Sequence, residues 1–150
     1  ISRGLVGSEM CIRDRLGTRE PEIYGADSTA DILKELAVEA ERLGRSIEII
    51  QSNEEGVLVT ALQEARDKAT SILFNLAAYT HTSIALRDAL AMFDGPKVEV
   101  HLSNNDSREK FRQVSLTAGV SDGSVVGFGA DSFYLGLNAV HRLLRKREGA

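Results

Sequence analysis

The chain has 150 residues, of which 43% are hydrophobic and 27% charged, a balance typical of one globular domain with a single core. Its formal net charge of −4 argues against a nucleic-acid surface, and no stretch approaches the roughly 18 apolar residues of a membrane span. We therefore expect neither nucleic acid nor a membrane among its partners. The single cysteine, Cys11, excludes an intrachain disulfide and a cysteine-based zinc site, and it fits a reducing, cytoplasmic setting.

The first fifteen residues do not follow the pattern of the rest. Residues 1–15 show neither the alternation of a strand nor a helical stripe, and they lack the continuous apolar region of a signal peptide. The run VGSEMCIRDR within them resembles translated sequencing-adapter read-through, and the alternative is a native disordered tail. We predict that residues 1–15 are a non-native or disordered segment, that one domain spans residues 16–146, and that residues 147–150 form a disordered tail.

From residue 16 onward, helical and strand patterns alternate. Apolar residues at helical spacing predict helices over residues 28–43, 57–65, 84–93 and 133–144, with Gly44 ending the first. Strands are predicted at residues 46–51, 71–76, 97–102 and 124–128. This order predicts an α/β fold, a flavodoxin-like doubly wound parallel sheet with helices on both faces. That fold needs one more strand before Leu16, so the first strand is missing or has been replaced.

Ligands bind such sheets at the carboxyl ends of the strands, where chemically capable side chains gather in this sequence. The loop from Leu16 to Gly25 carries Arg19 and Tyr24. A phenol has an unperturbed pKa of about 10, and a neighbouring guanidinium lowers that pKa, so Tyr24 beside Arg19 is a candidate general base. The alternative is a surface loop with a half-buried tyrosine and a solvated arginine.

A second group of candidates follows the strand predicted at residues 71–76. Asn75 ends that buried strand, where an amide needs partners, and His81 stands just before a helix N-terminus. Together they can hold the hydroxyls and the carboxylate of a small acid. Alternatively, Thr82 or Ser83 caps the helix and His81 is a solvated loop residue.

A third group lies on and after the strand predicted at residues 97–102. Glu99 and His101 are two residues apart and share a face, where a carboxylate can fix the imidazole tautomer and poise the ring as a general acid. The alternative is the polar face of an edge strand. Arg108 and Arg112 are four apart and can converge on one anion, or else they lie on a solvated helix turn. His141, in the last predicted helix, is interpreted as structural.

A specific pattern runs in order from Leu16 to about Leu144. Its pieces are LGTREPEIYG at 16–25, QSN at 51–53, EG at 55–56, AAYTHTSIALRDAL at 77–90, VEVHLSN at 98–104, RE at 108–109, FR at 111–112 and GFGAD at 127–131. Together they resemble the type II 3-dehydroquinate dehydratases. The resemblance implies a hydro-lyase of the shikimate pathway of aromatic amino acid and chorismate biosynthesis, which converts 3-dehydroquinate to 3-dehydroshikimate by anti elimination through an enolate.

The resemblance also implies no cofactor and no metal, as expected for three scattered histidines without a HExxH or HxH pair. By the same resemblance, Tyr24 abstracts the proton alpha to the ketone and Arg19 assists it. His101 protonates the departing hydroxyl, and Glu99 orients His101. The substrate is held by Asn75, His81, Leu102, Ser103 and Arg112, with Asp88 reaching the site across a subunit boundary. The implied assembly is a homo-dodecamer built from trimers, and the loop with Arg19 and Tyr24 acts as a lid.

The sequence departs from this family mainly at its start. Of a family motif like NGPNLNLLGTREP only LGTREP remains, and Ile12 stands where an Asn helps to hold a water facing the enolate oxygen. Softer departures are Leu76 for a usual Pro, Asp106 for a His, and Gln113-Val114 for a His pair. Three alternatives stay open: an impaired relative that only binds the small cyclic acid, a dehydroquinase of quinate breakdown, and an unrelated flavodoxin-like domain.

Overall fold

Five parallel strands form one sheet in the computed structural model, which describes residues 5–8 and 29–149. The strands are β1 (Leu5–Ser8), β2 (Ile49–Ser52), β3 (Ile72–Asn75), β4 (Lys97–His101) and β5 (Gly123–Val126). They lie in the order β2-β1-β3-β4-β5, and every neighbouring pair is parallel. This order confirms the predicted flavodoxin-like sheet.

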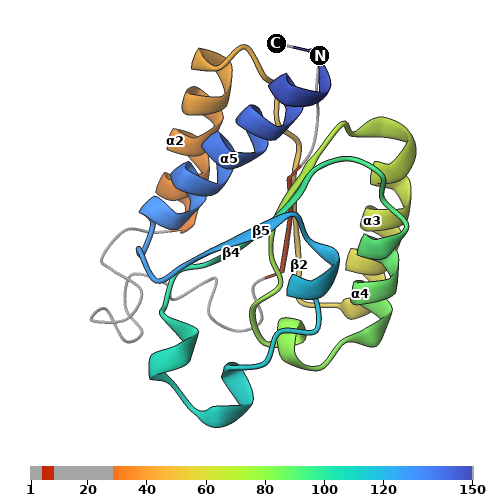
Figure 1. The fold of residues 1–150 in the computed structure, drawn as a ribbon, viewed down its shortest axis with the longest axis vertical. Helices are drawn as coiled ribbons and strands as arrows, with labels where there is room; N and C mark the ends of the chain where they lie inside the picture. Colours follow the sequence, from red (N-terminus) through yellow and green to blue (C-terminus); the bar gives the residue numbers. More distant parts are fainter. Residues whose placement is uncertain (1–4, 9–28, 150) are drawn as a thin grey trace.

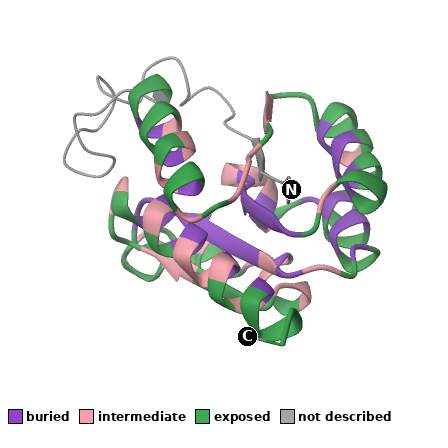
Figure 2. Ribbon diagram, turned by 90° about the horizontal axis from the view of Figure 1, so that it is seen from above, coloured by how far each residue is buried: buried purple, intermediate pink, exposed green. Residues whose placement is uncertain are grey.

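Among the described residues, two helices cover each face of the sheet, as Figure 1 illustrates. Helices α2 (Thr29–Arg42) and α5 (Asp131–Arg147) pack on one face, and α3 (Glu55–Lys68) and α4 (Ile84–Ala91) pack on the other. Figure 2 shows that the buried residues gather on the strands and on the helix faces turned toward them. Within the described ranges, no helix is both long and apolar enough to cross a membrane. The doubly wound architecture predicted from the alternating patterns is therefore confirmed.

The hydrophobic core is divided by the sheet into two clusters. One cluster joins Leu36 of α2 and Leu137 of α5 to Val100 of β4. The other joins Leu62 of α3 and Phe74 of β3 with the buried face of α4. Burial of each such large side chain contributes about 1.5–3 kcal/mol, so both faces of the central strands are firmly held. The strand ends that follow are thus anchored on a rigid layer.

Capping interactions fix the helix ends that the sequence predicted. Gly44 has a φ of +71° and its amide donates to Glu41 O at 2.9 Å, while Arg45 N donates to Ala40 O at 2.9 Å. This pair of bonds is a Schellman cap, which favours glycine because the position needs a left-handed backbone. At the start of α4 the hydroxyl of Ser83 accepts from Leu86 N at 3.0 Å. The alternative that Ser83 caps this helix is confirmed.

A first strand, β1, stands at the position that the fold requires. That strand was expected to be missing or replaced, and residues 1–15 showed no strand pattern. The backbone of Leu5–Ser8 nevertheless pairs with β2 on one side and with β3 on the other. Pairing to a parallel neighbour uses backbone groups alone, so a run without clear side-chain alternation can still occupy a central position. Whether these residues are native to the protein stays a prediction.

The C-terminal end also extends further than the sequence indicated. Helix α5 continues through Arg147, one residue beyond the predicted end of the domain. The next residue, Glu148, accepts hydrogen bonds from Arg45 Nη1 at 2.9 Å and Nη2 at 3.1 Å. A bidentate ion pair therefore ties Glu148 to the rest of the domain.

The end of β5 is fixed to the end of β4. Gly127 has a φ of +97°, which ends the strand at Val126, two residues earlier than predicted. Its amide donates to His101 O at 3.1 Å, and Gly129 N donates to Leu102 O at 2.9 Å. A Cβ on Gly127 would lie 3.1 Å from the Asn104 side chain. The backbone that follows His101 therefore packs so closely against residue 127 that glycine is favoured there.

Candidate active site

A glutamate and a histidine form a buried pair at the carboxyl end of β4. His101 Nε2 lies 2.9 Å from Glu99 Oε1, and the two side chains are only 8% and 1% exposed. Val98 and Val100 point to the opposite face, into the core cluster with α2 and α5. The predicted pairing of Glu99 with His101 is confirmed, and the edge-strand alternative is wrong because β4 lies between β3 and β5.

Three hydroxyl groups from loops, none of them predicted from the sequence, surround the carboxylate of Glu99, and a fourth, Ser124 Oγ of β5, lies 3.5 Å from Oε2. Thr117 Oγ1 donates to Oε1 at 2.8 Å and Thr80 Oγ1 donates to the same oxygen at 3.2 Å. Ser115 Oγ lies 3.0 Å from Oε1 and 3.1 Å from Oε2. Thr80 and Thr117 are fully buried. A sequence gives no sign of such a group, because these residues come from two loops that meet only in the fold.

These contacts set the charge of the carboxyl group. Burial raises the pKa of Glu99, but the hydrogen bond and charge of His101, with the hydroxyls of Thr117 and Ser115, outweigh it, and the net pKa of Glu99 is lowered. Glu99 is therefore an ionised acceptor, and we assign the shared proton to Nε2 of His101. Among the described residues Nδ1 of His101 has no hydrogen-bond partner, so it is available to a ligand.

His81 lies beside this pair. Its ring is stacked on that of His101, with centroids 6.4 Å apart and an angle of 15° between the planes. His81 Nδ1 lies 2.7 Å from Val114 O, and since a carbonyl only accepts, Nδ1 carries the proton. In the neutral ring Nε2 is then an acceptor. The structure thus brings His81 to the Glu99–His101 pair, as the sequence predicted.

Asn75 ends β3, the strand that neighbours β4, and is 9% exposed. Its Oδ1 accepts a hydrogen bond from Ala77 N at 3.0 Å. Ala77 has a φ of +49°, a left-handed backbone that costs an alanine about 1–2 kcal/mol. The Asn75 side chain therefore stabilises a strained turn, and it leads the chain into the turn η2 (Ala77–His81).

The segment after β4 forms two short turns, η3 (Asn105–Ser107) and η4 (Lys110–Arg112). Arg108 Nη1 donates to Ser103 Oγ at 3.2 Å. Arg112 Nε donates to Glu109 Oε2 at 2.9 Å, and Arg108 Nε lies 3.7 Å from the same oxygen. The two arginines therefore converge, as predicted, but the anion they share here is the Glu109 carboxylate.

The remaining predicted residues lie in three different places. Leu102 is buried, and its carbonyl accepts from Gly129. Asp88 has a side chain 63% exposed on α4, and within the described residues it pairs with Arg87 at 2.9 Å. Arg19 and Tyr24 lie outside the described residues.

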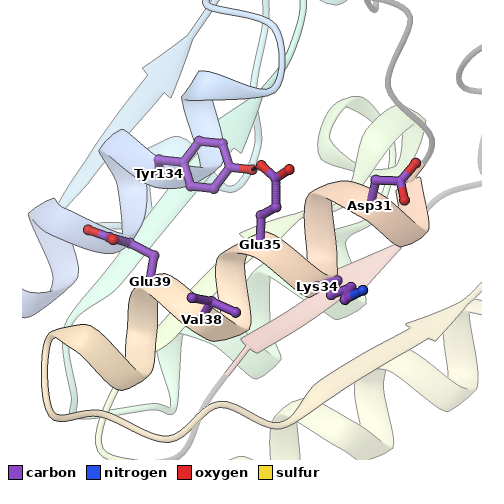
Figure 3. A pocket seen from close by; sticks show the side chains of 6 residues that line it. All are labelled: Asp31, Lys34, Glu35, Val38, Glu39 and Tyr134. Carbon is purple, nitrogen blue, oxygen red and sulfur yellow. Dashed lines mark hydrogen bonds between the residues drawn. The ribbon is translucent and has the colours of Figure 1, made fainter.

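A hollow of about 640 Å³ lies elsewhere, between α2 and α5 (Figure 3). Tyr134 of α5 points across it and donates to Glu35 Oε2 at 2.8 Å. Among the described residues its lining holds three carboxylates against one lysine, with no histidine or arginine, a balance that does not suit an anionic acid. It is lined by Asp31, Lys34, Glu35, Val38, Glu39 and Tyr134. Over the described part of the chain, no three His, Cys, Asp or Glu side chains gather as metal ligands would.

Comparisons with known proteins identify the family of this chain. The model of the family "Dehydroquinase class II" matches residues 11–141, a span that begins inside the segment predicted to be foreign. The 3-dehydroquinate dehydratase of Geotalea daltonii is 53% identical over 131 residues, which cover 87% of this chain and 91% of the relative. That of Stenotrophomonas maltophilia K279a is 53% identical over 125 residues, or 83% and 85% of the two chains. The crystal structure of the type II dehydroquinase from Propionibacterium acnes has a TM-score of 0.88 at 32% identity and covers 95% of this chain and 97% of its own. The chain therefore belongs to the class II dehydroquinase family.

Proposed function

We propose that this chain is a 3-dehydroquinate dehydratase, which removes water from 3-dehydroquinate to give 3-dehydroshikimate. The observation that carries the proposal is the buried Glu99–His101 pair at the carboxyl end of a central strand, with Asn75 and His81 beside it. Elimination of water next to a ketone needs a base, a group that stabilises the enolate, and an acid for the leaving hydroxyl. The pair supplies the acid.

The leaving-group step falls to His101. Glu99 is ionised and holds the proton of the neutral ring on Nε2, so Nδ1 faces the substrate. When His101 is charged, the proton on Nδ1 passes to the departing hydroxyl as the carbon–oxygen bond breaks, and the hydroxyl leaves as water. Glu99 stabilises the charged ring before this transfer and keeps its orientation afterwards.

The proton-abstraction step falls to Tyr24, and Arg19 has the role of stabilising the phenolate and the enolate. Tyr24 takes the proton from the carbon alpha to the ketone, and the electron pair of that bond forms the enolate. The enolate then expels the hydroxyl to which His101 gives its proton. These two roles rest on the sequence motif LGTREPEIYG, since both residues lie outside the described residues.

Substrate binding is proposed to use several neighbouring groups. His81 Nε2 and the Asn75 amide bind hydroxyls, while the backbone amides of Leu102 and Ser103 with the Arg112 guanidinium bind the carboxylate. To bind the substrate carboxylate, Arg112 releases the carboxylate of Glu109, a side chain that is 54% exposed. Such an exchange of one surface ion pair for another costs little.

We further propose a cytoplasmic enzyme that assembles as a homo-dodecamer built from trimers, and that serves aromatic amino acid biosynthesis. The exposed Asp88 carboxylate on α4 then belongs to the site of a neighbouring subunit. Size measurement in solution tests the assembly. We expect an Asp88→Asn variant to have lower turnover. Such a loss from this exposed position supports a contribution of Asp88 to the site across a subunit boundary.

Turnover of 3-dehydroquinate, followed by the absorbance of the conjugated product, tests the function. We expect activity that falls at least about 100-fold in His101→Ala and in Tyr24→Phe, because each removes one partner of general acid–base catalysis. An Arg66→Gln variant on the far side of α3 serves as the control. A full-length protein with no turnover, both as it stands and with residues 1–15 exchanged for those of a relative, contradicts the proposal.

The first residues carry a second candidate function. Ile12 replaces the Asn that holds a water at the enolate in the family, which favours a relative that binds the cyclic acid with reduced turnover. We propose that residues 1–15 are foreign and that their replacement by a relative's start restores turnover. Full activity of the unaltered chain contradicts this second proposal. Binding without turnover after the exchange favours the binding-only relative.

A further inference from the structure

One short segment, Val114–Thr117, contacts both His81 and Glu99 of the candidate site. Its first carbonyl, of Val114, accepts from His81 Nδ1 at 2.7 Å. In the middle of the segment, Leu116 N donates to Thr80 O at 2.9 Å, which attaches the segment to the turn η2. Its last residue, Thr117, is fully buried. The segment is thus fixed against the site by backbone as well as side-chain bonds.

The Thr117 hydroxyl makes the shortest hydroxyl contact to Glu99. Oε1 of Glu99 receives Thr117 Oγ1 at 2.8 Å, His101 Nε2 at 2.9 Å and Thr80 Oγ1 at 3.2 Å. With Ser115 Oγ at 3.0 Å, four donors approach this one oxygen, which favours a carboxylate that only accepts over a carboxyl that must donate. Without Thr117, this almost fully buried oxygen loses its best hydroxyl donor, so the carboxylate form loses part of its stabilisation against burial.

Ser115 supports this arrangement. Its hydroxyl accepts from Ala118 N at 2.9 Å, so its proton is free to point to Glu99, which it reaches at 3.0 and 3.1 Å. It also lies 3.2 Å from Thr117 Oγ1. Ser115 and Thr117 therefore form one connected group of donors, joined through hydrogen bonds that strengthen one another.

We propose that the hydroxyls of Thr117 and Ser115 are positioning groups that keep Glu99 ionised, hold the proton of neutral His101 on Nε2, and so leave Nδ1 for the leaving hydroxyl. The proposal rests on the proposed function only for the last of these effects. Neither residue touches the substrate in this arrangement. Their removal therefore changes the protonation of the Glu99–His101 pair and leaves the binding groups in place.

A matched pair of variants in the full chain tests the proposal. Thr117→Val keeps the shape of the side chain and loses the hydroxyl, while Thr117→Ser keeps the hydroxyl and loses a methyl group. We expect Thr117→Val to lower kcat about tenfold with KM within about twofold, and to move the acid limb of the kcat–pH profile upward by roughly one pH unit. Thr117→Ser should leave kcat within about twofold of the original and should leave the acid limb of the kcat–pH profile where it was.

A second measurement does not depend on turnover. The ¹⁵N resonances of the His101 ring report which nitrogen carries the proton, and comparison with His101→Gln assigns them. We expect the Nε2-protonated form in the original chain and in Thr117→Ser, and a shift toward mixed forms in Thr117→Val. If the original chain has no dehydratase activity, the proposed function fails while this measurement still decides the inference.

Two results overturn the proposal. One is a Thr117→Val protein whose His101 resonances and acid limb are unchanged. The other is an equal loss in Thr117→Val and Thr117→Ser, which indicates packing alone. If Thr117→Val does not fold, Ser115→Ala takes its place. We expect Ser115→Ala to change kcat, the acid limb and the His101 resonances in the same direction but by less. Thr60→Val, on an exposed residue of α3 whose hydroxyl bonds Gly56 O at 3.0 Å, is the control and should change nothing.

Discussion

The imidazole rings of His81 and His101 lie nearly parallel, 15° apart, with their centroids separated by 6.4 Å. Each ring uses one nitrogen inside the protein, His81 with Val114 O and His101 with Glu99 Oε1. The other nitrogen of each ring has no partner among the described residues. Two neutral rings fixed in this way present two acceptors side by side, an arrangement suited to the hydroxyl groups of a polyhydroxylated ring.

Replacement of His81 by phenylalanine keeps an aromatic ring beside His101 and removes both nitrogens. We expect KM for 3-dehydroquinate to rise by about tenfold or more, with a smaller change in kcat, because a hydrogen bond to a substrate hydroxyl is lost. Steady-state kinetics measure both constants. Tyr79→Phe, in the same turn, loses only a bond to Asn53 O and should keep the original KM. An unchanged KM in His81→Phe contradicts substrate contact by His81.

Substitution of Glu99 by glutamine should change how stability depends on pH. The pKa of Glu99 is lower in the folded than in the unfolded state, so its stabilisation is complete above the unfolded value of about 4.3 and is lost as pH falls through the folded value. Glu99→Gln should lower the free energy of unfolding by about 1–3 kcal/mol at pH 7, because buried donors lose their charged acceptor. Its free energy of unfolding should also change less as the pH falls below neutrality. Urea unfolding between pH 3 and pH 7 measures this, with the exposed Glu64→Gln as control. Parallel pH curves for Glu99→Gln and the original protein argue against an ionised Glu99.

His141 in α5 should destabilise the protein in mildly acidic solution. Burial, with the positive charges of Arg45 and Arg145, lowers the pKa of His141, and its Nδ1 is buried without a partner among the described residues. The folded state therefore binds this proton less readily than the unfolded state. Stability is complete above the unfolded pKa of about 6.5 and falls as pH decreases below it.

The variant His141→Leu removes the titrating group and keeps an apolar side chain beside Leu36 and Leu144. We expect it to lose less stability than the original protein between pH 8 and pH 5, a range in which Glu99 does not titrate. Urea unfolding at the two pH values gives the comparison. If both proteins lose the same free energy of unfolding, His141 does not contribute to the pH dependence of stability between pH 8 and pH 5.

Gly136 in α5 allows the helix to approach the sheet closely. A Cβ there would lie 2.7 Å from Leu73 Cδ1 and 2.7 Å from Val100 Cγ2, both in fully buried side chains. Overpacking costs about 1–3 kcal/mol, more than the roughly 1 kcal/mol that alanine gains over glycine in a helix. We therefore expect Gly136→Ala to lower the unfolding free energy by about 1–2 kcal/mol. Gly56→Ala in α3, where nothing lies within 4 Å of the added Cβ, should be neutral or slightly stabilising.

Most of the fold was predictable because each strand and helix has its own local pattern. The alternation of Lys97–His101 predicted both β4 and the shared face of Glu99 and His101. Boundaries were less accurate where local patterns continue past a backbone change, as in β5, which ends before Gly127. The pairing of Leu5–Ser8 could not be predicted, because it uses backbone groups, which side-chain patterns do not record.

The site was predictable only in part, for a related reason. His81 and His101 were found by their position at strand ends. Thr80, Ser115 and Thr117 were not, because a hydroxyl becomes important only through the carboxylate that it meets, and that meeting depends on two loops distant in sequence. The contact between Arg108 and Ser103 was missed for the same reason.

The central place of β1 has a consequence for how the chain folds during synthesis. Its partners are residues 49–52 and residues 74–75, so the first strand to leave the ribosome waits for two later ones. Until then both of its edges expose unpaired backbone groups, and such edges favour association between nascent chains. Replacement of this strand is therefore expected to reduce the yield of folded protein during expression more than the equilibrium stability of molecules that have already folded.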